Sequence, residues 1–465
     1  MYRLQIYSVK RKINENMERK RWLRLSFLAI IKEFRYAKSI IIITLTVVAV
    51  IPFNFVVATT TDVEDTKTIT SYEIEWSQSY GDTGSDLAGS VIQTIDSGYA
   101  FAGVYGLPEE QEQLSAILWL MKTNSSGYHV WNETFWCRYG WGIQGLIQTT
   151  DGGFAIAGFA IEGGDVILVK TDVNGNHEWN RTIGGNKTAE QALSIIQTVD
   201  EGYVLSGYSF SYGTGSQDFW LVKVNSTGYH EWNRTFGGNG DEVAWSIVHT
   251  TDGGFVLTGG TQSYGAGESD IWLLKVNSSG HHEWNHTFGG IRDDNSYSLV
   301  QTADGGFAIA GTTTTLEYLT ENTFKVVGMD FWLVKTDKNG IQEWNRSFHH
   351  SGDESCFVMI QTSDHGFALA GDIRDSDTWF VKTNSTGHQV WSHIFPETGI
   401  RSMIQTSDGG IVLGGSTFSS AGDGDALLLK LGKSTKTTTT ASSFMLELLF
   451  LSLLVLVVFS RKRRP

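Results

Sequence analysis

A single arrangement of apolar and polar positions recurs along the chain. Its most regular part is a run of the form Gln-Thr-x-Asp-Gly-Gly-Phe, in which a polar turn separates two apolar segments. The aspartate of this run recurs at Asp96, Asp151, Asp200, Asp252, Asp304, Asp364 and Asp408. The intervals between these aspartates are 55, 49, 52, 52, 60 and 44 residues, so the mean repeat length is 52. A repeat of this length suits one small β-sheet per unit.

Each repeat predicts four short strands. In the fourth repeat they cover Val243–Thr250, Gly254–Thr261, Asp270–Asn277 and His282–Phe288. The two middle segments are almost continuously apolar, which is typical of strands that pack on both faces. Asp-Gly-Gly, Asn-Gly and Ser-Gly pairs supply the positive φ angles of tight hairpins. No window has the apolar period of a core helix, so the sequence predicts an all-β protein.

The two ends of the repeat region complement each other. The seventh unit ends at Leu431, after its third strand, and lacks a fourth strand with Glu-Trp-Asn. The segment Tyr72–Gly81 matches such a fourth strand, for example His230–Gly237. We therefore predict a seven-bladed β-propeller of four-stranded blades over residues 72–431, closed by an N-terminal strand, because closure removes open sheet edges. A linear array of sheets would leave Trp76 without a partner.

An apolar segment precedes the repeats. Residues 39–58 carry no charge and follow a basic stretch, so we interpret residues 1–58 as a basic n-region with a signal peptide or signal anchor. The n-region is long, and a start at Met17 would shorten it. Cleavage after Ala58 is compatible with the small residues there, and the sequence leaves open whether it occurs.

A second apolar segment follows the repeats. Residues 432–443 are a Thr/Ser-rich tether, 444–460 are expected to form a transmembrane helix, and 461–465 are a basic tail. The positive-inside rule places this tail in the cytoplasm. The apolar run is slightly short for a bilayer core of about 30 Å, so flanking residues must contribute. We expect a body anchored at the cell membrane and exposed outside the cell.

Charge and composition narrow the range of partners. The chain of 465 residues has a net charge of −15, and residues 59–432 hold 18 Lys/Arg against 46 Asp/Glu. Such an acidic body repels nucleic acid, so we expect no DNA or RNA partner. Cys137 and Cys356 lie in distant repeats and have no metal-binding spacing, and the repeat register disfavours a disulfide between them.

Ten Asn-x-Ser/Thr sequons lie between the two apolar segments, as expected of an exported glycoprotein. They are Asn124, Asn132, Asn180, Asn186, Asn225, Asn233, Asn277, Asn285, Asn345 and Asn384. Nine of the ten occupy positions set by the repeat, so their number partly reflects duplication of one unit.

The repeat resembles that of archaeal and bacterial cell-surface β-propeller repeat proteins. The shared pattern is carried here by Asp252–Gly259, Asp270–Gly280 and Trp284–Gly290, with six further copies over about residues 72–431. This resemblance implies the propeller fold and a secreted or surface location, and it implies no reaction.

A second similarity is to the tryptophan-docking repeat of quinoprotein propellers, carried by Leu333–Gly340 and Trp344. It implies that the blade tryptophans lock adjacent blades together; these are Trp131, Trp179, Trp232, Trp284, Trp344 and Trp391. The sequence shows no cluster of cationic and calcium-binding residues for a quinone. Sialidase-type Asp boxes differ, because Phe, Tyr or Ile stands here where they have Trp.

The longer connections are expected on the face opposite the short turns, where propellers usually bind their ligands. The connections from a fourth strand to the next first strand are acidic, and their candidate ligand-face residues are Asp82, Asp86, Asp241, Glu242, Asp293, Asp294, Asp353 and Glu354. One interpretation is a ring that binds cations or a basic ligand. The other is solvated loop charge with backbone capping. No calcium-loop spacing is present, so we predict no metal or other cofactor, with calcium as the open alternative.

Histidines precede the blade tryptophan at His129, His177, His230, His282 and His388. They occur once per blade, too far apart to share a metal, so we expect a structural role for them. No Ser-His-Asp arrangement emerges from the motifs, and we assign no catalytic residue.

Two connections depart from the repeat. Thr312–Met329 is about ten residues longer than its counterparts and is expected as a loop with exposed Leu316, Tyr318, Leu319 and Phe324. Tyr105–Ser115 is also enlarged. The sequence thus predicts a monomeric, membrane-anchored extracellular propeller that acts as a binding, adhesion or envelope-structural module for a protein or glycan ligand. The alternative is an extracellular enzyme, either carbohydrate-active or quinone-dependent.

Overall fold

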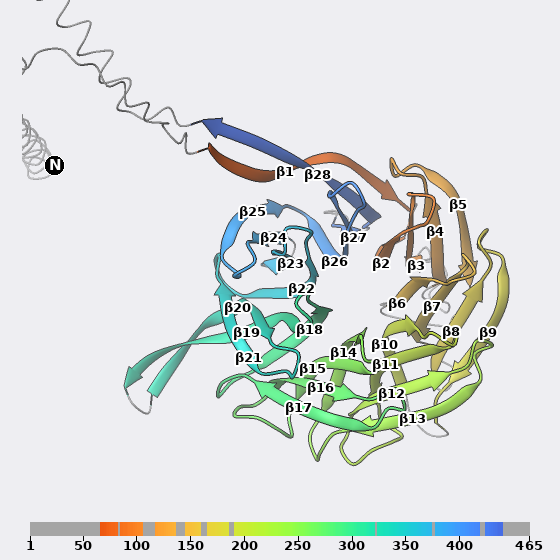
Figure 1. Cartoon of the computed structure of the whole chain (residues 1–465), viewed down its shortest axis with the longest axis horizontal. Coiled ribbons are helices and arrows are strands. Elements are labelled where there is room, and N and C mark those ends of the chain that lie inside the picture. Colours follow the sequence, from red (N-terminus) through yellow and green to blue (C-terminus); the bar gives the residue numbers. More distant parts are fainter. Residues whose placement is uncertain are drawn as a thin grey trace, which may run out of the picture. The chain divides into compact units, whose positions relative to one another are not determined.

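The computed structural model describes residues 66–439, apart from 82–83, 106–116, 136–144, 160–164, 186–189, 321–322, 374–376 and 419–423. In these residues 28 strands form seven four-stranded sheets, arranged as blades around an axis (Figure 1). Lys67–Thr438 is one compact unit. The prediction of an all-β, seven-bladed propeller is therefore confirmed.

The strands of the first three blades are β2 Leu87–Gln93, β3 Tyr99–Tyr105, β4 Ile117–Thr123 and β5 His129–Phe135; β6 Gly145–Gln148, β7 Phe154–Phe159, β8 Val166–Thr171 and β9 His177–Ile183; β10 Glu190–Gln197, β11 Tyr203–Ser209, β12 Asp218–Val224 and β13 His230–Phe236. The next two blades contain β14 Glu242–His249, β15 Phe255–Thr261, β16 Asp270–Val276 and β17 His282–Phe288; β18 Asp294–Gln301, β19 Phe307–Thr320, β20 Thr323–Thr336 and β21 Gln342–Phe348.

The sixth blade contains β22 Glu354–Gln361, β23 Phe367–Ile373, β24 Asp377–Thr383 and β25 Gln389–Phe395. The seventh contains β26 Thr398–Gln405, β27 Ile411–Thr417, β28 Ala426–Thr439 and, from the other end of the chain, β1 Thr66–Tyr80. Figure 1 shows the first strand of each blade nearest the axis and the fourth strand at the rim.

The hydrophobic core lies between neighbouring blades. All residues of β12 and β16, the third strands of two such blades, are buried. Phe219 of β12 packs against Trp272 of β16 with ring centroids 4.7 Å apart. These strands read as apolar runs because both of their faces are removed from water by an adjacent blade, which is the main favourable term in folding.

The predicted closure of the ring is confirmed. The last sheet has the order β1-β28-β27-β26, so the N-terminal strand completes the blade that the C-terminal repeat begins. Both strands exceed their expected lengths, since β1 begins at Thr66 and β28 ends at Thr439. Much of the segment 432–443, expected as a tether, is therefore strand.

The blade tryptophans lock adjacent blades, as predicted. The ring of Trp232 lies against Gly280 in the turn between the third and fourth strands of the next blade, where an added Cβ would stand 2.7 Å from the indole. The same contact joins Trp76 to Gly127, Trp131 to Gly175, Trp179 to Gly228, Trp284 to Gly340 and Trp344 to Gly387. Glycine is needed at these turns because φ is positive there, and because a side chain would displace the tryptophan.

Trp391 has a different partner, because the last blade has no turn between its third and fourth strands. It packs against Tyr72 of β1 at a centroid distance of 5.9 Å. Cys356 is buried and is not part of a disulfide, while Cys137 lies outside the described residues. The segments expected to enter the membrane, 39–58 and 444–460, also lie outside them. The part of the chain that the structure describes contains no helix long and apolar enough to cross a bilayer.

Candidate functional site

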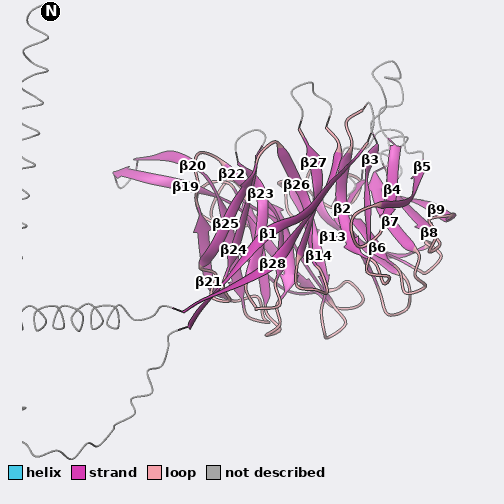
Figure 2. Ribbon diagram, turned by 90° about the horizontal axis from the view of Figure 1, so that it is seen from above, coloured by secondary structure: helices cyan, strands magenta, loops and turns pink. Residues whose placement is uncertain are grey.

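The blades present two different faces. We call the face with the turns between strands 1 and 2 and between strands 3 and 4 the turn face. The opposite face carries the connections between strands 2 and 3 and those between blades, and we call it the loop face. Figure 2 shows the ring from the side, with the hairpin of β19 and β20 extending away from it.

On the turn face, a buried lysine in every blade pairs with the aspartate of the recurring turn. In the fourth blade, Lys275 is 4 % exposed, and its Nζ lies 3.1 Å from Asp252 Oδ2 and 2.9 Å from Glu283 Oε2. The hydrogen bond from Thr250, with those from the Gly254 backbone and Lys275, lowers the pKa of Asp252 to about 2. These ion pairs tie the two turns of a blade together, so the recurring aspartate is structural.

On the loop face, the predicted acidic residues separate into two sets. Asp293 and Asp353 are exposed and Asp241 is half-buried, whereas Asp86, Glu242, Asp294 and Glu354 are buried; Asp82 lies outside the described residues. Glu242, Asp294 and Glu354 begin the first strands of the fourth, fifth and sixth blades, and Asp86 directly precedes the first strand of the first blade. Only the exposed set is available to a ligand from solvent.

Glu242 shows what the buried set does. Its Oε1 accepts hydrogen bonds from Thr261 Oγ1 at 2.9 Å and from the Ser263 backbone at 3.1 Å. Its Oε2 accepts one from the Gly238 backbone at 2.9 Å. Both oxygens are satisfied, so Glu242 caps the two neighbouring connections, as the capping interpretation of these acidic loops requires.

A second carboxylate stands beside each of these caps, at the start of the third strand of the preceding blade. Such pairs are Asp165 with Glu190, Asp218 with Glu242, Asp270 with Asp294, Asp330 with Glu354, and Asp425 with Asp86 around Gly81. Burial and then the neighbouring Glu190 raise the pKa of Asp165 to about 6. Two carboxylates this close disfavour ionisation of both.

Glycine separates the two carboxylates of a pair. At Gly237 an added Cβ would stand 2.0 Å from Asp218 Oδ1 and 2.4 Å from Glu242 Oε2. Gly289 occupies the equivalent position beside Asp270 and Asp294. The repeat therefore keeps the first glycine of its Phe-Gly-Gly run for a steric reason that the sequence does not show.

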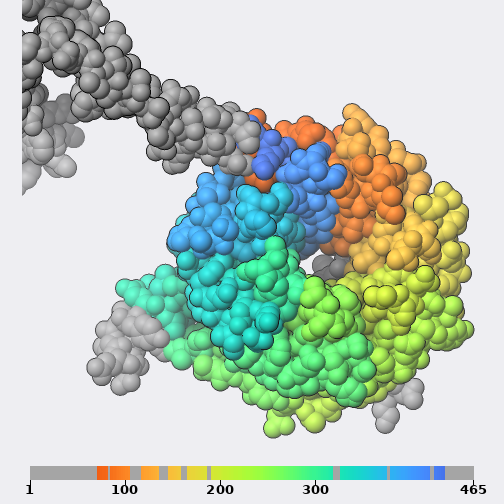
Figure 3. All heavy atoms as spheres, viewed as in Figure 1, coloured from red at the N-terminus to blue at the C-terminus, as the bar shows by residue number. Residues whose placement is uncertain are grey.

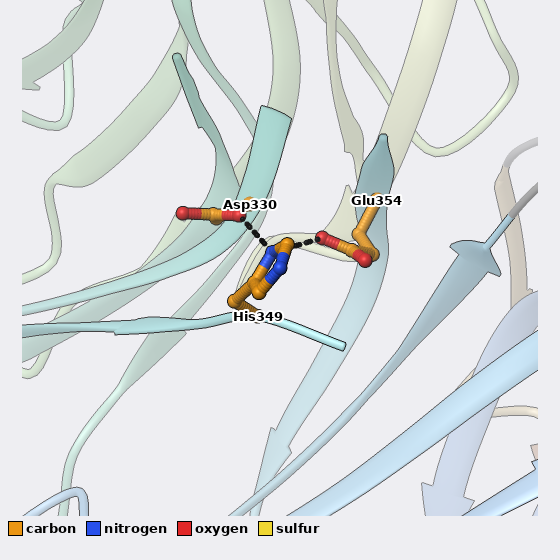
Figure 4. A group of neighbouring side chains, drawn as sticks. All are labelled: Asp330, His349 and Glu354. Atoms are coloured by element: carbon orange, nitrogen blue, oxygen red, sulfur yellow. Dashed lines mark hydrogen bonds and ion pairs between the residues drawn. The ribbon is translucent and has the colours of Figure 1, made fainter. Parts of the chain in front are cut away.

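The junction of the fifth and sixth blades is different, because His349 replaces that glycine. Figure 4 shows its imidazole between the two carboxylates. Nδ1 lies 2.9 Å from Asp330 Oδ1 and 3.3 Å from Glu354 Oε2. The hydrogen bond with Asp330, followed by the charge of Glu354, raises the pKa of His349. The sequence motifs did not predict this group, although the change from Phe-Gly-Gly to Phe348-His349-His350 is a visible signal.

The expectation that Thr312–Met329 is a loop is wrong, since 312–320 and 323–329 are strand. β19 and β20 continue past the ring as a paired hairpin, with Thr314 opposite Met329 and Leu316 opposite Val326. Its β-branched residues suit an extended pair. Leu316 is half-buried and Val326 is 47 % exposed; the side chains of Tyr318, Leu319 and Phe324, and the loop 106–116, lie outside the described residues.

A ladder of half-buried side chains links the innermost strands of four blades. Trp245 lies 5.3 Å from Tyr297, and Tyr297 lies 5.2 Å from Phe357. The guanidinium of Arg401 lies 4.5 Å above the ring of Phe357 and pairs with Asp372 at 2.9 Å. Each ladder residue stands at the register shift of its strand, where a β-bulge redirects a side chain. Figure 3 shows the ring hollowed near its axis.

Comparison with known proteins supports the fold. No model of a known protein family matches the sequence, and no curated protein matches it. The WD40 domain of Pan2 from Neurospora crassa is similar in structure, with a TM-score of 0.50 and 9 % identity over 79 % of this chain and 97 % of that one. The β-propeller domain of the trilobed protease from Pyrococcus furiosus gives a TM-score of 0.43 and 7 % identity over 78 % and 98 %. The fold that the structure and this comparison show is thus a β-propeller.

Proposed function

We propose that this protein is a membrane-anchored extracellular β-propeller that acts as a non-enzymatic binding, adhesion or envelope-structural module through its loop face. The hairpin of β19 and β20 carries this proposal, because it is long, departs from the repeat and presents exposed Val326 and Val327. Apolar side chains held on a projecting element are costly in water without a partner. The flanking apolar segments 39–58 and 444–460 support the location.

The exposed acidic residues favour a partner with a basic contact surface. Asp293 and Asp353 are exposed beside the base of the hairpin, since the Asp293 carbonyl accepts a hydrogen bond from Thr314 and Asp353 Oδ1 accepts one from the Met329 backbone. Charged pairs at the rim of an interface mainly accelerate association and are screened by salt. A protein or a glycan carrying amino groups fits this surface.

The test is binding of cells that display the full chain to glycan and peptide arrays at two salt concentrations. In one variant, residues 317–325 are replaced by Asn-Gly, which closes the hairpin at Leu316 and Val326. In another, Asp241 and Asp293 become Asn and Asp353 becomes Gln, because Asn at 353 would create an Asn-Glu-Ser sequon. We expect the first to lose about tenfold or more in affinity, and the second to lose affinity mainly at low salt.

The matched control removes three charges from the turn face, by Asp172→Asn, Glu201→Gln and Asp337→Asn. It should bind as the native chain does. Equal binding by all variants, with the fold intact, would contradict a loop-face site. Protease added to intact cells checks the location separately, because an external body is digested and an internal one is protected.

An extracellular enzyme is the second candidate. The ladder of Trp245, Tyr297, Phe357 and Arg401 favours a carbohydrate ligand for it, because aromatic faces and an ion-paired guanidinium suit sugar rings and hydroxyl groups. Loss of glycan binding on Trp245→Ala, with hairpin variants unaffected, would move the site to the axis. Turnover of a bound glycan would then distinguish an enzyme from a lectin.

A further inference from the structure

The junction between the fifth and sixth blades differs from the two junctions that precede it. In the third and fourth blades, Oδ2 of Asp218 or Asp270 accepts hydrogen bonds from two backbone N–H groups of the connection before it. Asp330, in the same position of the fifth blade, instead accepts a hydrogen bond from the Thr315 hydroxyl and directs Oδ1 toward His349. The carboxylate is thus turned from its loop to the inserted imidazole.

One oxygen of the second carboxylate has no hydrogen-bond donor among the described residues. Glu354 is fully buried, and its Oε1 accepts hydrogen bonds from the backbone of His350 and Ser351. Its Oε2 accepts no hydrogen bond from any described residue and faces His349. The equivalent Glu242 has both oxygens bonded. A buried carboxylate oxygen without a donor is costly, and a cation beside it removes that cost.

From this geometry we infer that Asp330, His349 and Glu354 form a binding site for a divalent transition-metal ion of the zinc class. The three ligand atoms lie within 4.8 Å of one another. Bonds of about 2.0–2.1 Å in a tetrahedron separate ligand atoms by about 3.3–3.4 Å. The Nδ1 separations of 2.9 Å and 3.3 Å are close to that edge, so small side-chain movements admit the ion.

The donor set selects the ion. One imidazole nitrogen with two carboxylate oxygens suits zinc and its neighbours, whereas calcium prefers oxygen ligands alone. The His349 side chain is 53 % exposed, so one side of the site is open to a water ligand. The ligands come from β20, from the residue that follows β21 and from β22, so the ion joins the base of the hairpin to the next blade.

The experiment is equilibrium dialysis of the purified full-length protein against zinc chloride, with bound metal measured by mass spectrometry. The native chain should bind one zinc ion more than His349→Gly, a variant that restores the glycine found at Gly237 and Gly289 of the two preceding junctions and is expected to fold. Glu354→Gln should weaken binding by about 100-fold or more. Cobalt substitution should give visible absorption bands that His349→Gly lacks.

The matched control is His350→Gly, which restores the second glycine of the run and leaves the three ligands in place. It should bind as many zinc ions as the native chain and keep the cobalt spectrum. Equal zinc content in the native chain and His349→Gly would overturn the proposal. So would failure of the native chain to bind zinc at micromolar free concentration, and His349 would then be only an ion-paired imidazole.

Discussion

At the scale of single residues, buried carboxylates carry much of the organisation of the loop face. Glu242 and Glu190 satisfy backbone donors in the connections around them, and each has a second carboxylate close by. This arrangement fixes the loops at a cost in charge repulsion. The cost depends on pH because a proton can be shared within the pair.

Asp165→Asn is expected to stabilise the fold at pH 7.5 and to flatten its dependence on pH. The folded pKa of Asp165 is about 6, above the unfolded value of about 3.9. The stabilising contribution of Asp165 to the free energy of unfolding is therefore fully present below about pH 4, and it is lost as the pH rises through 6. Thermal unfolding from pH 4 to 7.5 measures this. An unchanged slope in the variant would show that Asp165 does not titrate in this range.

At the scale of the elements, adjacent blades meet where a tryptophan covers a turn glycine. Gly280 has a φ of +75°, and an added Cβ would stand 2.7 Å from Trp232. Gly253 has a φ of +85° and nothing within 4 Å of the same position. Alanine at Gly253 would therefore cause backbone strain alone, whereas alanine at Gly280 would also disturb the contact between blades.

We expect Gly280→Ala to lower the free energy of unfolding by about 2–3 kcal/mol, since strain and overpacking add. Gly253→Ala should cost only about 1 kcal/mol, from the backbone alone. Chemical denaturation of both variants tests the difference. Equal losses would mean that Trp232 moves aside freely and does not lock the blades.

The strands could be predicted from the sequence more completely than the candidate metal site could. Repeated Asp-Gly-Gly turns place the strands of the fourth blade to within about two residues, because turn chemistry is local. The hairpin was expected as a loop because its tip carries no Asn-Gly or Asp-Gly signal. Asp330, His349 and Glu354 come together only through the register of separate strands, which sequence spacing does not reveal.

At the scale of the whole molecule, the ring depends on β1. Tyr72 packs on Trp391, and Trp76 packs on Tyr99 at 5.7 Å, so β1 contacts the blades on both sides of the one it completes. Deleting residues 72–80 should lower the free energy of unfolding by about 4 kcal/mol or more, since each of these aromatics loses burial worth about 2 kcal/mol.

Thermal unfolding of the deletion variant measures this loss. The control deletes residues 62–70, which removes a stretch of similar length and keeps Tyr72 and Trp76. If both deletions unfold at the native temperature, β1 is not needed to hold the ring closed.

The pairing of β1 with β28 also sets the order of events during synthesis. β1 is made first and its partner last, so almost the whole described chain must be made before they can meet. Contacts between such distant segments form slowly, and an unpaired edge strand is open to pairing with other chains until they do. A chain that stops before residue 426 has six complete blades and lacks β28, the strand with which β1 pairs. Formation of a stable closed ring therefore requires that translation has reached the last strand.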